Sequence, residues 1–134
     1  ELGFNYRMPN LNASLGCGQF ERLNQIIASK RLLATQYRDF FKNSDFEFVN
    51  EPLGCESNYW LNAIICENNE TRNHVLTETN RQNVMTRPVW TMMTKLPMYS
   101  ECIQGPLVQT EWLESRLINL PSSPPGPLRE TEHA

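Results

Sequence analysis

The sequence has no long hydrophobic run and no strong excess of one charge. No apolar stretch among its 134 residues approaches the roughly 20 residues that a membrane-spanning helix needs. Residues 1–7 lack the basic start and apolar stretch of a signal peptide. Lys and Arg total 12 against 15 Asp and Glu, so the composition forces no basic patch for nucleic acid. We therefore expect a cytoplasmic protein with neither a membrane nor a nucleic-acid partner.

Metal-ligating side chains are also few. The two histidines, His74 and His133, are far apart, and no two cysteines have the CxxC spacing of a zinc ribbon or a thioredoxin-type site. These absences predict no metal site. An even number of cysteines leaves a disulfide framework open, but we expect the thiols to be reduced and mostly buried. The cysteines are Cys17, Cys55, Cys66 and Cys102.

Apolar residues are plentiful enough for one domain. They make up 40% of the chain, but 134 residues are too few for two complete cores. The clearest element is a long helix from about Asn10 to Phe41, because apolar residues recur there at three- and four-residue steps. Gly16 and Gly18 lie inside it, and each costs about 1 kcal/mol relative to Ala. Either another backbone or a ligand comes close to them, or the helix is locally weak.

Shorter elements follow the long helix. Alternating or apolar segments bounded by polar clusters predict three strands, the second of them central. They are residues 46–49, 59–66 and 83–89. Two further helices are expected at residues 68–81 and 110–118, the second with Thr110 as its cap and with Trp112 and Leu113 turned inward. The pattern predicts an α+β fold in which the long N-terminal helix packs on a small sheet of about three strands.

Two segments lack a regular pattern. Residues 90–104 are expected to be irregular. Residues 124–134 form a proline-rich tail that can continue neither a helix nor a sheet, so we expect it to be disordered. The predicted domain therefore spans residues 1–123.

Two polar and aromatic clusters are candidate binding sites. Asn5, Tyr6 and Arg7 precede the N-terminus of the long helix, where amide and guanidinium donors suit a phosphate or carboxylate. Arg87 and Trp90 follow a predicted strand, where they can bind an anion and stack on a flat ring. Ordinary polar residues at a helix start and a packed loop tryptophan explain the same patterns. No Gly-rich phosphate loop, paired carboxylates or Ser–His–Asp set is evident in the sequence.

The first cluster belongs to a longer motif. Residues 3–23 read GFNYRMPNLNASLGCGQFERL, which closely resembles the signature of nucleotide-sugar aminotransferases of the DegT/StrS type. These are pyridoxal-phosphate (PLP) enzymes with the aspartate aminotransferase fold. Residues 86–90 and 95–99 look like the branch that aminates 4-keto-6-deoxy sugars for legionaminic acid and related bacterial surface glycans. Residues 118–123 are similar to the closing residues of these enzymes, so the resemblance covers about residues 1–123.

The resemblance implies roles for individual residues. It places Asn5 on the cofactor phosphate of the partner subunit of a homodimer, with Arg7 at the same shared site. Tyr6 lies beside them on the substrate side. Arg87 and Trp90 would approach the nucleotide sugar. The implied reaction moves an amino group, from glutamate, to the C4 ketone of a nucleotide-linked 4-keto-6-deoxy sugar.

The resemblance also implies a missing part. In this family the lysine that carries the cofactor and the Asp that holds its pyridinium nitrogen lie upstream of the Asn-Tyr-Arg motif. Lys30, Lys42 and Lys95 do not match that context. We therefore expect residues 1–123 to be the C-terminal part of such an enzyme, a linking helix plus small domain. Alone it would contain no catalytic residue, retain no PLP and be inactive. The alternative is a catalytically inactive module for self-association or protein interaction.

Overall fold

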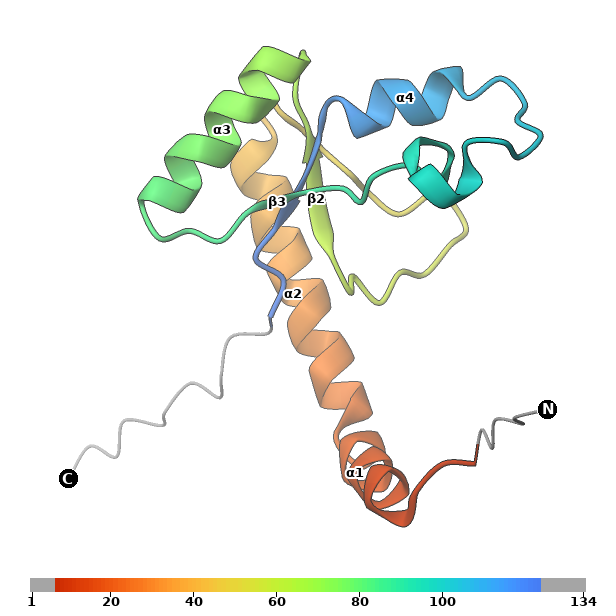
Figure 1. The fold of residues 1–134 in the computed structure, drawn as a ribbon. Coiled ribbons are helices and arrows are strands. Elements are labelled where there is room, and N and C mark those ends of the chain that lie inside the picture. The colour runs from red at the N-terminus through yellow and green to blue at the C-terminus, as the bar shows by residue number, and fades with distance from the viewer. Residues whose placement is uncertain (1–6, 124–134) are drawn as a thin grey trace.

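The computed structural model describes residues 7–123. It has a small antiparallel sheet with helix α2 (Leu23–Phe41) packed behind it in the view of Figure 1. Helix α3 (Asn69–Arg81) lies beside the sheet, and helix α1 (Asn10–Phe20) sits at the far end of an arm that continues from α2. The predicted α+β class is confirmed.

The predicted long helix is two helices rather than one. The backbone of Arg22 leaves the helical region, with φ −106° and ψ 1°, and its N–H donates to Gln19 O at 3.1 Å in a tighter turn. The ladder of helical hydrogen bonds is thereby interrupted between α1 and α2. Gly16 and Gly18 just before this break lower the intrinsic helix propensity of α1. Of these two helices, only α2 packs on the sheet, because α1 buries none of its residues.

The sheet has four strands, one more than predicted. The strands are β1 (Glu47–Phe48), β2 (Asn62–Ile65), β3 (Arg87–Pro88) and β4 (Leu117–Leu120). Their order is β1-β2-β4-β3, and each neighbouring pair is antiparallel. The second predicted strand is central, as expected. Pro88 is tolerated because β3 is an edge strand.

The prediction for residues 110–118 was wrong in its second half. Helix α4 is only Val108–Glu114, so Thr110 lies inside it and caps nothing. Trp112 and Leu113 are exposed rather than inward, and α4 buries none of its residues. Leu117 and Ile118 belong to β4, where alternate residues are buried and a period of two replaces the helical one.

The core lies between the sheet and helices α2 and α3. Ile64 and Ile118 face each other across β2 and β4, and both side chains are fully buried. Ala34 of α2 is buried against them, while α3 adds partly buried apolar residues. Those flanking residues are Tyr37 and Phe41 from α2, Phe46 before β1, and Val75 and Leu76 from α3.

The cysteines do not follow the prediction that most are buried. Cys66 is buried in the core, and burial raises the pKa of its thiol. The other three, Cys17, Cys55 and Cys102, are exposed, and none of the four forms a disulfide. Only Cys66 therefore acts as the small core residue that we expected, and the three exposed cysteines do not.

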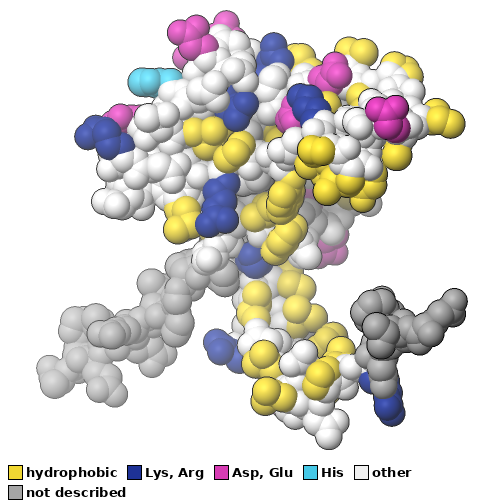
Figure 2. Space-filling model, viewed as in Figure 1, with side chains coloured by type: hydrophobic (Ala, Val, Ile, Leu, Met, Phe, Trp, Pro, Cys, Tyr) yellow, Lys and Arg dark blue, Asp and Glu magenta, His cyan; other side chains and the backbone are white. Residues whose placement is uncertain are grey.

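Apolar side chains remain on the surface of the arm, as Figure 2 shows over α1 and the adjoining end of α2. Leu11, Leu15 and Phe20 are all exposed. A side chain added at Gly16 or Gly18 would meet nothing within 4 Å. Within residues 7–123, therefore, no backbone approaches these glycines. No helix in this part of the chain is long and apolar enough to cross a bilayer.

Candidate functional site

The sheet has an outer face that carries one of the predicted binding residues. Asn119 lies between Ile118 and Leu120 in β4, and both of those neighbours are buried in the core. Because side chains alternate along a strand, Asn119 lies on the opposite face. Arg87 is the register partner of Asn119 in β3, so its side chain shares that face.

A pocket of about 550 Å³ opens on this face. Two tryptophans stack at it: the rings of Trp60 and Trp90 have centroids 6.0 Å apart and an interplanar angle of 16°. Trp60 is 63% exposed and Trp90 is 70% exposed, so much of each side chain remains open to solvent. The other lining residues are Leu61, Met85, Arg87, Pro88, Asn119, Leu120, Pro121, Ser122 and Ser123.

Lys30 of α2 fixes one wall of the pocket. Its Nζ donates to the backbone oxygens of Trp60 at 3.2 Å and Ser122 at 2.8 Å. The buried hydroxyl of Ser122 in turn accepts from the backbone N–H of Asn62 at 2.7 Å and donates to Leu120 O at 2.8 Å. The segment after β4 and the segment before β2 are therefore held together at the position of Trp60.

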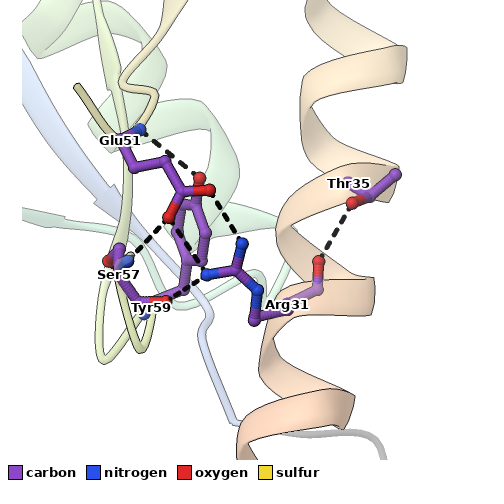
Figure 3. A network of polar contacts seen from close by, with 5 residues as sticks. All are labelled: Arg31, Thr35, Glu51, Ser57 and Tyr59. Atoms are coloured by element: carbon purple, nitrogen blue, oxygen red, sulfur yellow. Dashed lines mark hydrogen bonds and ion pairs between the residues drawn. The ribbon is translucent and has the colours of Figure 1, made fainter. Parts of the chain in front are cut away.

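A second network, drawn in Figure 3, supports the same segment from the side of α2. The Arg31 guanidinium makes a two-point pair with the Glu51 carboxylate, at 2.8 and 3.0 Å. Arg31 also donates to Ser57 O at 2.6 Å, and the Ser57 N–H donates back to Glu51 at 2.6 Å. The Arg31 hydrogen bonds, followed by that from Ser57, lower the pKa of Glu51 from 4.5 to about 2. We call this Arg31–Glu51–Ser57 set the loop clamp.

A strained residue, Tyr59, lies between the loop clamp and Trp60. Tyr59 has a φ of 44°, a left-handed conformation that an aromatic residue rarely adopts and that costs about 1–3 kcal/mol. Its buried ring stacks on Phe48 at 6.5 Å, and the Arg31 guanidinium lies 5.6 Å from the ring centroid. These contacts hold the turn that leads the chain from the loop through Trp60 into β2.

The structure brings together some of the predicted site residues. Arg87 and Trp90 both line the pocket, which the sequence could not establish. Arg7 is exposed and is not among the lining residues. Asn5 and Tyr6 lie outside the described residues.

Sequence reasoning missed Trp60 and Lys30. Trp60 lay in a segment interpreted as a buried strand, and Lys30 lay on the polar side of the long predicted helix. A large aromatic at the polar start of an otherwise apolar run was the one available signal for Trp60.

The three described lysines do not fit a Schiff base with PLP. A Schiff base needs an amino group that can lose its proton beside the cofactor. Lys30 is held by two carbonyl oxygens, and Lys95 pairs with Glu114, which lowers the pKa of that carboxyl. Lys42 is exposed near the end of α2, away from the pocket. No group of three or more His, Cys, Asp or Glu in residues 7–123 could hold a metal ion either.

Similar folds occur in solved aminotransferases. The structure of Helicobacter pylori PseC, an aminotransferase involved in pseudoaminic acid biosynthesis, matches with a TM-score of 0.81 at 19% identity. The match covers 92% of this chain and 34% of that one. NtdA from Bacillus subtilis, solved with bound cofactor PMP, matches at 27% identity with a TM-score of 0.72, over 91% of this chain and 29% of NtdA.

The sequence gives the more specific assignment. The profile of the DegT/DnrJ/EryC1/StrS aminotransferase family matches residues 1–130, and the chain belongs to this family. It is 34% identical to the GDP-perosamine synthase of Escherichia coli O157:H7 over 123 residues, which is 92% of this chain and 33% of that protein. The predicted resemblance is thus confirmed. The chain spans about a third of the length of the curated relatives it matches.

Proposed function

We propose that this chain is the C-terminal part, linking helix plus small domain, of a PLP-dependent nucleotide-sugar aminotransferase. The observation that carries the proposal is the family match over residues 1–130 together with coverage of only about a third of the relatives' length. The proposed reaction moves an amino group from glutamate to the C4 ketone of a nucleotide-linked 4-keto-6-deoxy sugar. We propose that it serves bacterial surface glycans and takes place in the cytoplasm.

In this proposal the chain supplies the sugar side of the active site. Arg87 and Trp90 contact the nucleotide sugar, which is supported by their position in one pocket. Tyr6 joins them on the substrate side. Asn5 and Arg7 reach the cofactor phosphate of the partner subunit in a homodimer. An amide and a guanidinium suit a dianionic phosphate without entering acid–base chemistry.

The lysine that carries PLP belongs, in this proposal, to a separate cofactor domain. This agrees with the failure of the described lysines to form a cofactor site. The domain boundary we propose lies near residue 123, with residues 124–134 as a tail outside the small domain.

The kinetic test uses the enzyme that contains this chain joined to a lysine-bearing domain. Arg87→Gln should raise the KM for the sugar nucleotide about tenfold or more, because a charge-assisted hydrogen bond is lost. The KM for glutamate should be unchanged. Arg81→Gln serves as the control, because Arg81 pairs with Glu78 on α3 and does not line the pocket. An Arg87→Gln enzyme with an unaltered sugar KM would remove this residue from the proposal.

The second candidate function is a catalytically inactive module for self-association or protein interaction. The exposed apolar residues of α1 favour it, since they have no partner among the described residues. Reading the coding sequence upstream of Glu1 separates the two candidates. An in-frame domain with a cofactor lysine supports the aminotransferase, whereas a true translation start at this point supports the module.

A further inference from the structure

We propose that Lys30 and Tyr37 of α2 are positioning residues for the sugar-side pocket. They touch no ligand there, but they fix the backbone of Trp60 and of residues 121–123, which are two walls of the pocket. The proposal rests on the proposed function for the ligand and the reaction. It deepens that function by placing a control of sugar binding on helix α2, which packs on the core face of the sheet, whereas the pocket opens on the outer face.

Lys30 stands on the face of α2 that packs on the sheet. Ala34, Tyr37 and Phe41 follow it at steps of four, three and four residues, so all four lie on one face of the helix. Ala34 is buried in the core, and Tyr37 and Phe41 pack against that core. A lysine at the end of such a stripe can lay its stem along the core while its ammonium reaches polar groups at the edge.

These two side chains hold three carbonyl oxygens at one end of the sheet. Lys30 Nζ donates to Trp60 O at 3.2 Å and to Ser122 O at 2.8 Å, and the Tyr37 hydroxyl donates to Pro121 O at 2.9 Å. Burial raises the pKa of Tyr37, so the phenol keeps its proton at neutral pH and remains a donor. Among residues 7–123, no Asp or Glu pairs with Lys30, so its charge serves the two carbonyls.

The residues held in this way are walls of the pocket. Trp60, Pro121 and Ser122 all line it, whereas Lys30 and Tyr37 do not. Lys30 lines a neighbouring recess, which shares Trp60 and Ser122 with the pocket. Lys30 therefore acts on a bound sugar through the backbone of other residues, which makes it a positioning residue rather than a binding residue.

The backbone of Trp60 in turn sets the tryptophan pair. Trp60 leads into β2 and Trp90 follows β3, and these two strands flank β4. Their rings stack with centroids 6.0 Å apart, and the strained Tyr59 before Trp60 needs outside contacts to keep the turn in place. A wall that is ordered in advance loses less entropy when the ligand binds, so release of Trp60 should weaken sugar binding.

The kinetic test uses the joined enzyme of the proposed function. Lys30→Met keeps an apolar stem and removes the ammonium, so the KM for the sugar nucleotide should rise about tenfold, with kcat and the KM for glutamate unchanged. Lys30→Arg keeps a charged donor and should restore most of the sugar affinity. Lys42→Met is the matched control, because Lys42 is exposed just after α2 and does not line the pocket.

Tyr37→Phe keeps the test decisive if Lys30→Met fails to fold. It removes one oxygen and keeps the ring, and it should raise the sugar KM severalfold, less than Lys30→Met does because a neutral hydrogen bond is weaker. A purely structural role would reduce the amount of folded enzyme without separating the two KM values. An unchanged sugar KM in whichever of the two variants folds, or an equal rise in both KM values, would overturn the proposal.

Near-ultraviolet circular dichroism of the 134-residue chain reports on the tryptophan pair without catalysis. The difference between the parent and Trp60→Phe spectra contains the signal of the stacked rings. This difference should lose most of its amplitude in a Lys30→Met background and return in a Lys30→Arg background. The difference for Trp112→Phe should stay the same, because Trp112 packs near Arg116 and does not line the pocket. An intact Trp60 difference in the Lys30→Met background would contradict the positioning role.

The two tests also separate this proposal from the proposed function. Sugar amination with a KM unaffected by Lys30→Met removes the positioning role and keeps the aminotransferase. A tryptophan signal that depends on Lys30, in an enzyme that aminates no nucleotide sugar, keeps the positioning of the pair and removes the proposed reaction.

Discussion

Helices α1 and α2 follow each other in the chain, yet they stand in opposite relations to the core. Helix α2 buries Ala34, holds the loop clamp through Arg31, and through Lys30 holds the backbone of two residues that line the pocket. Helix α1 buries nothing, and Leu15, for example, is 66% exposed. The apolar residues of α2 gather on one face, whereas those of α1 are spread around the helix. The difference in burial therefore follows the difference in pattern, and of the two helices only α2 packs on the sheet within residues 7–123.

The largest loss of stability is expected for a substitution in the core. Ile118→Ala should lower the free energy of unfolding by about 2–5 kcal/mol, because Ile118 is 0% exposed and its truncation leaves a cavity. Urea unfolding followed by circular dichroism measures the loss. Ile103→Ala is the control, and it should change stability by less than about 0.5 kcal/mol because Ile103 is fully exposed. Similar losses in the two variants would contradict the placement of the core.

A smaller loss of stability is expected when the loop clamp is broken. Arg31→Met should lower the urea midpoint by less than Ile118→Ala does, because it releases Glu51 and Ser57 from α2. Arg38→Met is the matched control on the same helix. Arg38 meets Asp39 only at 3.8 Å on the surface, so its loss should leave the midpoint in place. An unchanged midpoint in Arg31→Met would show that the clamp does not stabilise the fold.

The clamp also predicts how stability depends on pH. The pKa of Glu51 falls from 4.5 to about 2 in the folded chain, so the folded state binds this proton more weakly than the unfolded state. The stabilisation is therefore fully present above about pH 4.5 and is lost as the pH falls towards 2. Glu51→Gln should be less stable than the parent at neutral pH and should lose less stability over that acid range. An acid-unfolding curve parallel to that of the parent would contradict this assignment.

A smaller and purely local effect is expected in α1. Gly16→Ala should stabilise that helix by about 1 kcal/mol, because nothing in the described chain crowds the new methyl group. Amide hydrogen exchange should slow in α1, while the global unfolding midpoint stays the same. A lower global midpoint would mean that another part of the chain needs close approach at Gly16.

The smallest effect tests the arm directly. Leu15→Ala should change the free energy of unfolding by less than about 0.5 kcal/mol, since the side chain is mostly exposed. Amides of α1 should exchange faster than those of β2 and β4, whose residues are buried. A loss comparable to that of Ile118→Ala would show that α1 is part of the core.

Local signals predicted the elements that depend on local contacts. Helix α3 was placed to within one residue, because Asn68 caps it by accepting from the Thr71 N–H at 2.8 Å. Strand β4 was missed, because Leu117 and Ile118 fit a helical spacing as well as an alternating one. Only its pairing with β2 resolves the ambiguity.

Only part of the site could be predicted, because several of its contacts join residues far apart in the sequence. The resemblance indicated Arg87 and Trp90, and both line the pocket. Trp60 reaches Trp90 only through the sheet order, since the two residues are 30 positions apart. The pairing of Arg31 with Glu51 is likewise a contact across 20 positions, which periodicity cannot reveal.

The central proposal is that this chain supplies the sugar side of an aminotransferase site and that the cofactor lysine belongs to another domain. The most direct measurement mixes the 134-residue chain with one equivalent of PLP, records its absorbance, and determines its mass after borohydride reduction. We predict no aldimine band and no single modified lysine. A one-to-one aldimine that survives gel filtration would contradict the claim.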